Sequence, residues 1–295
     1  MRVVTLLPGA TEIVAALGGA GSLVAISHEC DYPTSVQHLP RVTSTPLDPN
    51  LPGAAIDAEV RRLRDAGQSV IAVEAALLRR LAPDLLITQD LCEVCAVSDG
   101  AVHRLAAALE TPPRVLSLAG RTVEGVMADI RAVARALDLD AEGEELIVGL
   151  QSRLRRLRRG APPAPRRVLC IEWLAPLYLA GHWVPDLVAA AGGHDVGAAA
   201  GAHSAVSSWE AAAALRPDLI AVMLCGFGLP RALGELEVLH DAAADRLLRS
   251  APVWVLDGNA YTSRPGPRMV DGAELLQAAM RGEARPGLAP WRPTR

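Results

Sequence analysis

Short runs of Val, Ile and Leu alternate along this chain with longer segments of helical periodicity. Candidate strands cover residues 3–7, 23–27, 84–88 and 115–118, and helical segments separate them. Apolar runs of this length are typical of parallel strands that helices cover on both faces. The alternation therefore predicts an α/β fold with mostly parallel, Rossmann-like sheets.

The helical segments differ in length. The first is expected over residues 11–17, where Gly18 and Gly19 supply a stop. Residues 122–159 contain no Pro and carry apolar side chains at helical spacing, which predicts a long connecting helix with a break near Gly143. A Pro-rich segment then ends the helix, and a strand is expected over residues 167–173.

A chain of 295 residues is long for one compact core, so two lobes are expected. Residues 74–88 and 210–222 support this division because each reads as a helix, a Pro-Asp turn and a buried strand. Two lobes of related design follow. We expect an N-terminal α/β lobe over residues 1–120, a connecting helix over 121–160 and a C-terminal α/β lobe over 161–295.

Composition excludes some classes of function. The net charge is only -4, every basic residue is Arg, and aromatic residues make up 3% of the chain, too few for base-stacking platforms. The densest basic run, residues 153–159, is interpreted as a solvated helix face because Leu154 and Leu157 repeat at helical spacing. No apolar run is long enough for a membrane helix. The chain is therefore not expected to bind nucleic acid or to span a membrane.

The opening of the chain, Leu6-Leu-Pro-Gly-Ala-Thr-Glu-Ile-Val-Ala-Ala-Leu-Gly18 followed by Leu23-Val-Ala-Ile-Ser-His-Glu-Cys-Asp-Tyr-Pro33, resembles a known family. These are the solute-binding proteins of ABC transporters for cobalamin, haem and siderophores, with the class III periplasmic-binding-protein fold. The likeness continues through Gly181-His-Trp-Val-Pro185 and Ser263-Arg-Pro-Gly-Pro-Arg268. It is nearest to the cobalamin-binding, BtuF-like members, and it implies two lobes that hold a corrinoid or a similar metal chelate.

The resemblance also implies a partner. In exported relatives, one Glu on each lobe docks onto Arg residues of the ABC permease, and Glu74 and Glu210 match those positions. The alternative is that each Glu complements the dipole of its helix, which stabilises a helix by about 0.3–1 kcal/mol.

The start of the chain bears on localisation. Met1 is followed at once by a predicted strand with no apolar signal region, and the five cysteines suit a reducing compartment better than a disulfide framework. If Met1 is the natural start, we expect a cytoplasmic protein. The alternative is a periplasmic or cell-surface protein whose signal has been removed.

Cysteines gather where ligands of open α/β sheets bind, just beyond the carboxyl ends of strands. Cys92 and Cys95 form a Cys-x-x-Cys pair, and Cys30 and Cys225 follow other strands, so four thiolates suited to zinc or an iron–sulfur cluster are one hypothesis. The other is that these are buried apolar residues, as we expect for Cys170.

Other side chains are candidates for ligand contacts. His28 is a candidate axial ligand for cobalt or iron, or a loop residue bonded to the backbone. His182 and Trp183 would offer a donor and a stacking face to a macrocycle, unless Trp183 packs in the core. The remaining aromatic candidates are Tyr32, Trp173, Trp209 and Tyr261.

Arg264 and Arg268 flank a rigid Pro-Gly-Pro loop and suit the amides and phosphate of a corrinoid. At the first helix, Pro8, Ala10 and Thr11 are expected to present main-chain amides to polar ligand groups. Thr11 is alternatively only the cap of that helix.

Catalytic motifs such as Gly-x-Ser-x-Gly, the Walker loop and His-Glu-x-x-His are missing from the sequence, so an enzyme is not expected. The leading hypothesis is a protein that binds cobalamin or a related corrinoid or metal chelate. The alternative is a cytoplasmic metalloprotein or redox protein whose cleft cysteines hold zinc or an iron–sulfur cluster.

Overall fold

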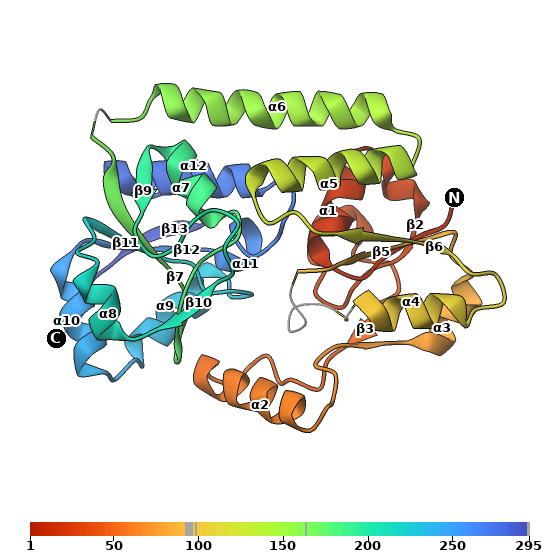
Figure 1. The fold of residues 1–295 in the computed structure, drawn as a ribbon, viewed down its shortest axis with the longest axis horizontal. Helices are drawn as coiled ribbons and strands as arrows, with labels where there is room; N and C mark the ends of the chain where they lie inside the picture. Colours follow the sequence, from red (N-terminus) through yellow and green to blue (C-terminus); the bar gives the residue numbers. More distant parts are fainter. Residues whose placement is uncertain (92–96, 98, 163, 294–295) are drawn as a thin grey trace. The chain divides into compact units, whose positions relative to one another are not determined.

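The computed structural model describes residues 1–91, 97, 99–162 and 164–293, and the chain divides into two compact units (Figure 1). The first unit consists of Met1–Leu51, Ala58–Gly120 and Glu124–Val148, and the second of Pro52–Asp57, Arg121–Val123 and Gly149–Arg295. Each unit has its own sheet and helices, so the predicted α/β fold is confirmed.

The first unit is built on a parallel sheet in the order β2-β1-β5-β6, accompanied by a short antiparallel pair, β3 and β4. Its strands are β1 (Val3–Thr5), β2 (Leu23–Ala25), β3 (Thr43–Ser44), β4 (Ala72–Val73), β5 (Leu85–Gln89) and β6 (Arg114–Leu118). Its helices are α1 (Pro8–Ala16), α3 (Ala75–Leu81), α4 (Asp99–Ala107) and α5 (Val123–Ala136), with 3₁₀-helices η1 (Gly19–Ser22) and η2 (Thr34–Val36). Helices α2 (Gly53–Asp65) and α6 (Asp140–Arg159) contribute residues to both units, as does α5, whose first residue, Val123, belongs to the second.

The second unit has a mixed sheet in the order β10-β8-β7-β11-β12-β13, with β9 also paired to β7. Strands β9, β7, β11 and β12 run parallel, whereas β8, β10 and β13 pair antiparallel. The strands are β7 (Arg166–Leu174), β8 (Leu177–Leu179), β9 (Gly193–Asp195), β10 (Ala205–Ser207), β11 (Leu219–Val222), β12 (Val253–Leu256) and β13 (Leu288–Trp291). The helices are α7 (Val184–Ala191), α8 (Trp209–Ala214), α9 (Leu229–Glu237), α10 (Ala242–Ser250), α11 (Gly258–Tyr261) and α12 (Met269–Arg281). None of the helices in the described ranges combines the length and apolarity needed to cross a bilayer.

The first helix begins earlier than the sequence predicts. Helix α1 starts at Pro8, with Leu7 as its N-cap, because Pro fits the first helical position, where no backbone N–H is needed. The hypothesis that Thr11 caps this helix is therefore wrong. The predicted stop is confirmed, since Gly18 follows the last turn with a φ of 80°.

The break in the long helical stretch lies at residues 137–139 and not near Gly143. Helix α5 ends at Ala136, Asp138 adopts a φ of 57°, and α6 begins at Asp140. Gly143 lies inside α6, where a Cβ atom would stand 2.5 Å from the Cβ of Ala134. The glycine therefore allows α6 to pack closely against α5, a contact that helical spacing alone does not reveal.

The internal repeat is confirmed as two helix–turn–strand segments, α3 with β5 and α8 with β11. In the first, the N–H of Arg2 donates to Asp84 Oδ2 at 2.6 Å, and the N–H of Asp84 donates back to Arg2 O at 2.8 Å. In the second, Arg167 and Asp218 make the same two bonds at 2.9 and 2.8 Å. The Pro-Asp turns thus hold β1 against β5 in the first unit and β7 against β11 in the second.

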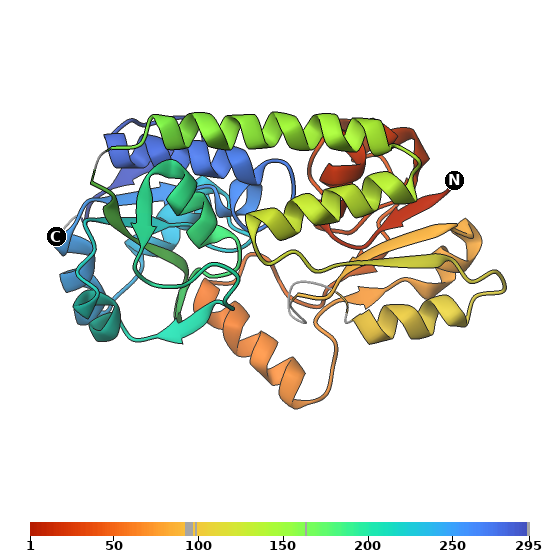
Figure 2. The ribbon, with the colours of Figure 1, turned by 45° about the horizontal axis from the view of Figure 1, so that its top comes forward.

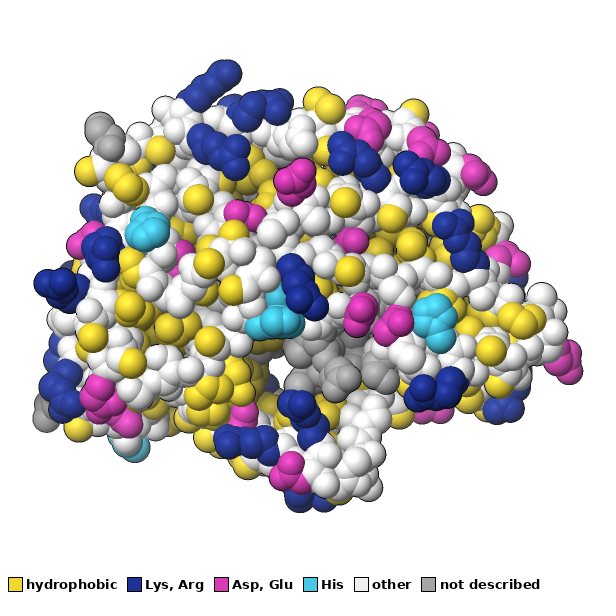
Figure 3. Space-filling model, in the orientation of Figure 1, with side chains coloured by type: hydrophobic (Ala, Val, Ile, Leu, Met, Phe, Trp, Pro, Cys, Tyr) yellow, Lys and Arg dark blue, Asp and Glu magenta, His cyan; other side chains and the backbone are white. Residues whose placement is uncertain are grey.

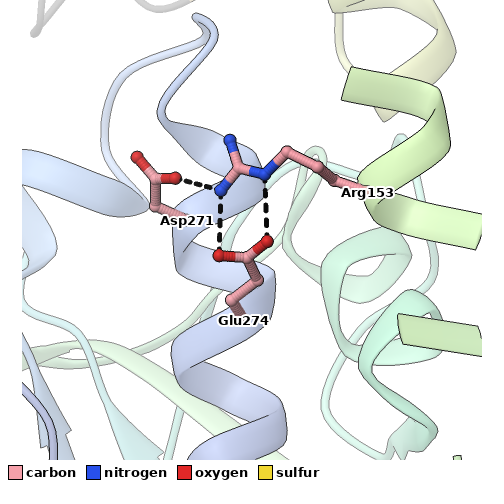
Figure 4. A network of polar contacts seen from close by, with 3 residues as sticks. All are labelled: Arg153, Asp271 and Glu274. Atoms are coloured by element: carbon pink, nitrogen blue, oxygen red, sulfur yellow. Dashed lines mark hydrogen bonds and ion pairs between the residues drawn. The ribbon is translucent and has the colours of Figure 1, made fainter. Parts of the chain in front are cut away.

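Helix α6 lies beside α12 in two views of the molecule (Figures 1 and 2). Leu154 and Leu157 are buried, as expected, and basic side chains gather over the carboxyl-terminal end of α6 (Figure 3). Arg153 departs from the expected solvated face, because its guanidinium bonds both carboxylate oxygens of Glu274 at 2.9 Å and also reaches Asp271 (Figure 4). Its bidentate geometry orients α6 on α12.

Replacing Arg153 with Ala should lower the free energy of unfolding by about 1–2 kcal/mol, because two acidic side chains on α12 lose their shared partner. Urea unfolding measures the change. Arg156→Ala is the matched control, since this Arg is exposed on the same helix and should change stability by less than about 0.5 kcal/mol. Equal effects of the two substitutions would contradict a specific role for Arg153.

A carboxyl group is buried beside Cys170 in the second unit. Asp195 Oδ1 accepts the N–H groups of Gly197 and Ala198 at 2.8 and 3.2 Å, whereas Oδ2 has no hydrogen-bond partner among the described residues. Burial raises the pKa of Asp195 from 3.8 to about 6, against the opposing effect of the two N–H groups. Burial, and then the Asp195 charge, raises the pKa of the Cys170 thiol, which stays neutral.

The raised pKa of Asp195 predicts a pH dependence of stability. The folded chain holds more protons than the unfolded chain between about pH 3.8 and 6, so this group lowers stability as the pH rises through that range. Asp195→Asn should remove the fall. Urea titrations measure the free energy of unfolding of both proteins at about pH 4 and pH 8. From the lower to the higher pH, the value for the variant should rise relative to that for the wild type by on the order of 2–3 kcal/mol. A difference that does not change with pH would refute the assignment.

Candidate functional site

The carboxyl end of β1 opens the candidate site of the first unit. Strand β1 ends at Thr5 and α1 begins three residues later, which brings Thr11 Oγ1 to 2.6 Å from Thr5 Oγ1 and 3.0 Å from Cys30 Sγ. All three side chains are buried. Pro8 and Ala10, predicted to meet a ligand, are also buried in the first turn of α1.

His28 follows β2, as predicted, and is held by Thr43. The main-chain N–H of His28 donates to Thr43 Oγ1 at 2.9 Å, and the ring Nδ1 lies 2.7 Å from the same oxygen. Burial, followed by the charge of Arg41, lowers the pKa of His28 below 6.5. The imidazole is thus neutral at pH 7 and is anchored through Nδ1 by the Thr43 hydroxyl, as metal-ligating His side chains are commonly anchored by an outer hydrogen bond. Tyr32, nearby in sequence, is 45% exposed.

The structure describes only two of the four cysteines in the four-thiolate hypothesis. Cys92 and Cys95 lie outside the described residues. Cys30 belongs to the first unit and Cys225 to the second. Within the described ranges, no group of three His, Cys, Asp or Glu side chains is arranged to hold a metal ion. The four-thiolate site therefore stays a prediction.

In the second unit, the loop after β8 carries His182 in an unusual conformation. Its φ is 53°, and its backbone pairs with the following loop, where the His182 N–H donates to Ala202 O at 2.6 Å and Gly201 N–H donates to His182 O at 2.8 Å. A Cβ on Gly181 would lie 2.5 Å from Ala202 O, so only glycine permits this approach. The two loops thereby fix the His182 backbone.

The His182 ring sits among polar and aromatic groups. Ser204 Oγ lies 3.4 Å from Nδ1, the His203 ring meets it edge-on with centroids 5.4 Å apart, and Nε2 is buried without a hydrogen-bond partner in the described part of the chain. Burial first, and then the charges of His203 and Arg121, lowers the pKa of His182. Sequence reasoning missed Ser204, His203 and Arg121, because only the fold brings them to this ring.

Trp183 and Trp209 occupy packing positions. The Trp183 indole N–H donates to Thr262 O at 2.9 Å, and its side chain is 7% exposed. Trp209 is 8% exposed and belongs to the core of the second unit. Core packing is the alternative that the sequence left open for Trp183, and a buried ring offers no flat face to a macrocycle.

The Arg residues of the Pro-Gly-Pro loop are held differently from each other. Arg264 is buried and donates to Asn259 Oδ1 at 2.8 Å. Arg268, the N-cap of α12, lies over the Tyr261 ring at 5.5 Å from its centroid. Both side chains are positioned by groups of the neighbouring helix α11.

The two predicted docking residues lie at helix starts. Glu74 is the N-cap of α3 and accepts a bond from Ser44 Oγ at 3.1 Å. Glu210 lies in the first turn of α8, its side chain 69% exposed and 4.0 Å from Arg246. Both are accessible, and both also stand where a negative charge complements a helix dipole.

Trp173 lines a cavity of about 170 Å³ in the second unit, together with Gly53, Phe227 and Glu235. This volume is below the roughly 300–1,000 Å³ of common ligand pockets. The cavity by itself is therefore too small for a macrocycle, and the role of Trp173 as a ligand contact stays a prediction.

A family profile described as periplasmic binding protein matches residues 3–254. Among solved structures, the periplasmic haem-binding protein HutB of Vibrio cholerae is 22% identical, with a TM-score of 0.68 over 95% of this chain and 98% of that chain. RhuT, a periplasmic haem-binding protein from Roseiflexus sp. RS-1 in apo form, is 23% identical, with a TM-score of 0.69 and the same coverage.

The periplasmic vitamin B12-binding protein BtuF of Vibrio cholerae is 20% identical, with a TM-score of 0.64 over 95% of this chain and 96% of that chain. At these identities the likeness is one of fold. A comparison with curated protein sequences finds no significant match.

The lowered pKa values of His28 and His182 predict that both rings titrate below pH 6.5 in the folded chain. Since protonation is disfavoured in the folded state, stability should fall as the pH drops below 6.5, and His28→Gln should remove part of that fall. NMR titration of the assigned ring signals measures the midpoints. A midpoint at or above 6.5 for either ring would show that its surroundings accept the charge.

Proposed function

The chain belongs to the periplasmic binding protein family, and from that premise we propose that it binds cobalamin or a related metal chelate as the solute-binding component of an ABC transporter. Proteins of this family bind small solutes and are not enzymes, in keeping with the missing catalytic motifs. Solved structures with the same fold include proteins named for haem and for vitamin B12. The profile itself does not choose between these ligands.

One observation carries the proposal: the buried Nε2 of His182 has no hydrogen-bond partner in the described residues. A buried polar atom in this state costs about 1–3 kcal/mol, which a ligand that engages it would offset. Because the pKa is lowered, the ring is neutral and keeps a lone pair for cobalt or iron. Binding through Nε2 places the ring proton on Nδ1, where Ser204 Oγ can accept it.

Two further candidate contacts are His28 in the first unit and Arg268 in the second. His28 is a second neutral imidazole at a strand end, anchored by Thr43. Arg268 carries a guanidinium suited to the amide, carboxylate or phosphate groups at the edge of such a chelate. Haem and cobalamin both combine a metal with polar groups of this kind, so the two remain separate outcomes of the test.

We also propose that Glu74 and Glu210 contact Arg residues of the permease. Each is exposed at the start of one copy of the internal repeat, so the two carboxylates occupy equivalent places in their units. Exposed carboxylates in a repeated position suit recognition by guanidinium groups.

The ligand is tested by titrating the purified chain with aquocobalamin and, separately, with haemin, followed by visible absorption and calorimetry. One of the two should bind with a Kd below about 10 μM, with a spectral change typical of imidazole on the metal. His182→Ala should weaken binding about tenfold or more and abolish that change. His38→Ala, which alters an exposed histidine, is the control.

Each outcome has a defined meaning. If neither chelate binds, the proposed function is wrong. If one binds and His182→Ala binds it as tightly as wild type with the same spectrum, the metal-ligand role of His182 is wrong while the binding function stands.

A further inference from the structure

The first residues of α2 form part of the second unit, far in sequence from the residues they contact. Gly53 N–H donates to both carboxylate oxygens of Glu235, at 3.0 and 3.2 Å, and Ile56 packs against the core of the unit. A Cβ on Gly53 would lie 3.2 Å from Glu235 Oε2 and 3.4 Å from Trp173 Cζ2. A glycine thus lets the start of α2 approach the Trp173 ring directly.

A cavity of about 170 Å³ remains at this contact. An apolar cavity of roughly 150 Å³ accommodates a benzene molecule, so this one has room for a single ring with a small substituent. Apart from Glu235 and His240, its walls are mostly apolar. The apolar walls include Gly53, Trp173, Leu224 and Phe227.

The walls contain three polar side chains, Trp173, Glu235 and His240, and the first two specify what such a ring should carry. Trp173 Nε1 is buried and has no acceptor among the described residues, and it is bonded to Cε2, an atom of the ring edge that faces Gly53. A ligand that bonds the Trp173 N–H must therefore carry a hydrogen-bond acceptor. The Glu235 carboxylate accepts from Gly53 and keeps lone pairs for a further N–H donor, and its charge disfavours anions.

We propose that this cavity binds a small uncharged ring compound with a carboxamide or lactam group, whose carbonyl accepts from Trp173 and whose N–H donates to Glu235. The Phe227 ring, 5.2 Å from the Trp173 ring and tilted to it by 58°, supplies an aromatic wall. The site is separate from the one proposed for a metal chelate, because its volume excludes a macrocycle. Its test needs no chelate, so either proposal can fail without the other.

The test uses the full chain and benzamide as the probe, followed by the indole N–H signals in proton–nitrogen NMR spectra. Benzamide should shift the Trp173 signal, assigned with Trp173→Phe, with a Kd of about 0.1–1 mM, as expected for a ligand of this size. Benzoate, which has the same ring but a negative charge, should leave the signal in place. Glu235→Gln should admit benzoate.

Trp173→Phe should weaken benzamide binding about fivefold or more, measured by ligand-observed NMR. Trp291→Phe, the same substitution outside the cavity walls, should leave it unchanged. Because Trp173→Phe also alters packing, hydrogen exchange of the Gly53 amide gives a second readout in the wild type, where benzamide should slow it. The proposal is overturned if benzamide shifts no Trp173 signal at about 5 mM, or if benzoate binds the wild type equally well.

Discussion

The pairing of a Pro-Asp turn with the start of a strand underlies both units. Asp84 and Asp218 each accept the N–H of the residue opposite, Arg2 and Arg167, and each donates its own N–H back. This pair of hydrogen bonds sets the register of β1 against β5 and of β7 against β11. The next residues of each strand pair are aligned in the same way. Strands β2 and β8, which precede the loops with His28 and His182, pair in turn with β1 and β7.

The elements that are predictable from the sequence are those that local pattern specifies. Buried runs of β-branched residues give the parallel strands, and Gly18 gives the end of the first helix. The break at residues 137–139 escapes prediction, because Asp138 adopts a left-handed conformation that its neighbours in sequence do not demand. Gly143 misleads for a related reason: its role is contact with Ala134 across a helix pair, and not the local interruption of a helix.

The candidate site, too, is only partly predictable from the sequence. The position after a predicted strand identifies His28, because strand ends can be found by pattern. His182 is singled out instead by its place beside Trp183, in a segment that resembles the family. Their chemistry depends on Thr43, Ser204 and His203, whose contacts exist only after folding. Trp183 illustrates the limit of residue type as a guide, since the indole that would suit a macrocycle is instead bonded to Thr262 O in the core.

The first residues of α2 have a consequence for how the chain is made. Gly53 and its partner Glu235 are separated by 182 residues, and Trp173 is also far downstream. On a ribosome, Gly53 therefore emerges long before the surface that will receive it exists, while β1, α1 and β2 already have their partners nearby. Contacts of such long sequence separation form only at the entropic cost of closing the loop between them, which slows folding. The segment that lines the small cavity must wait, undocked, for most of translation, so the second unit can close this wall only after its own strands are complete.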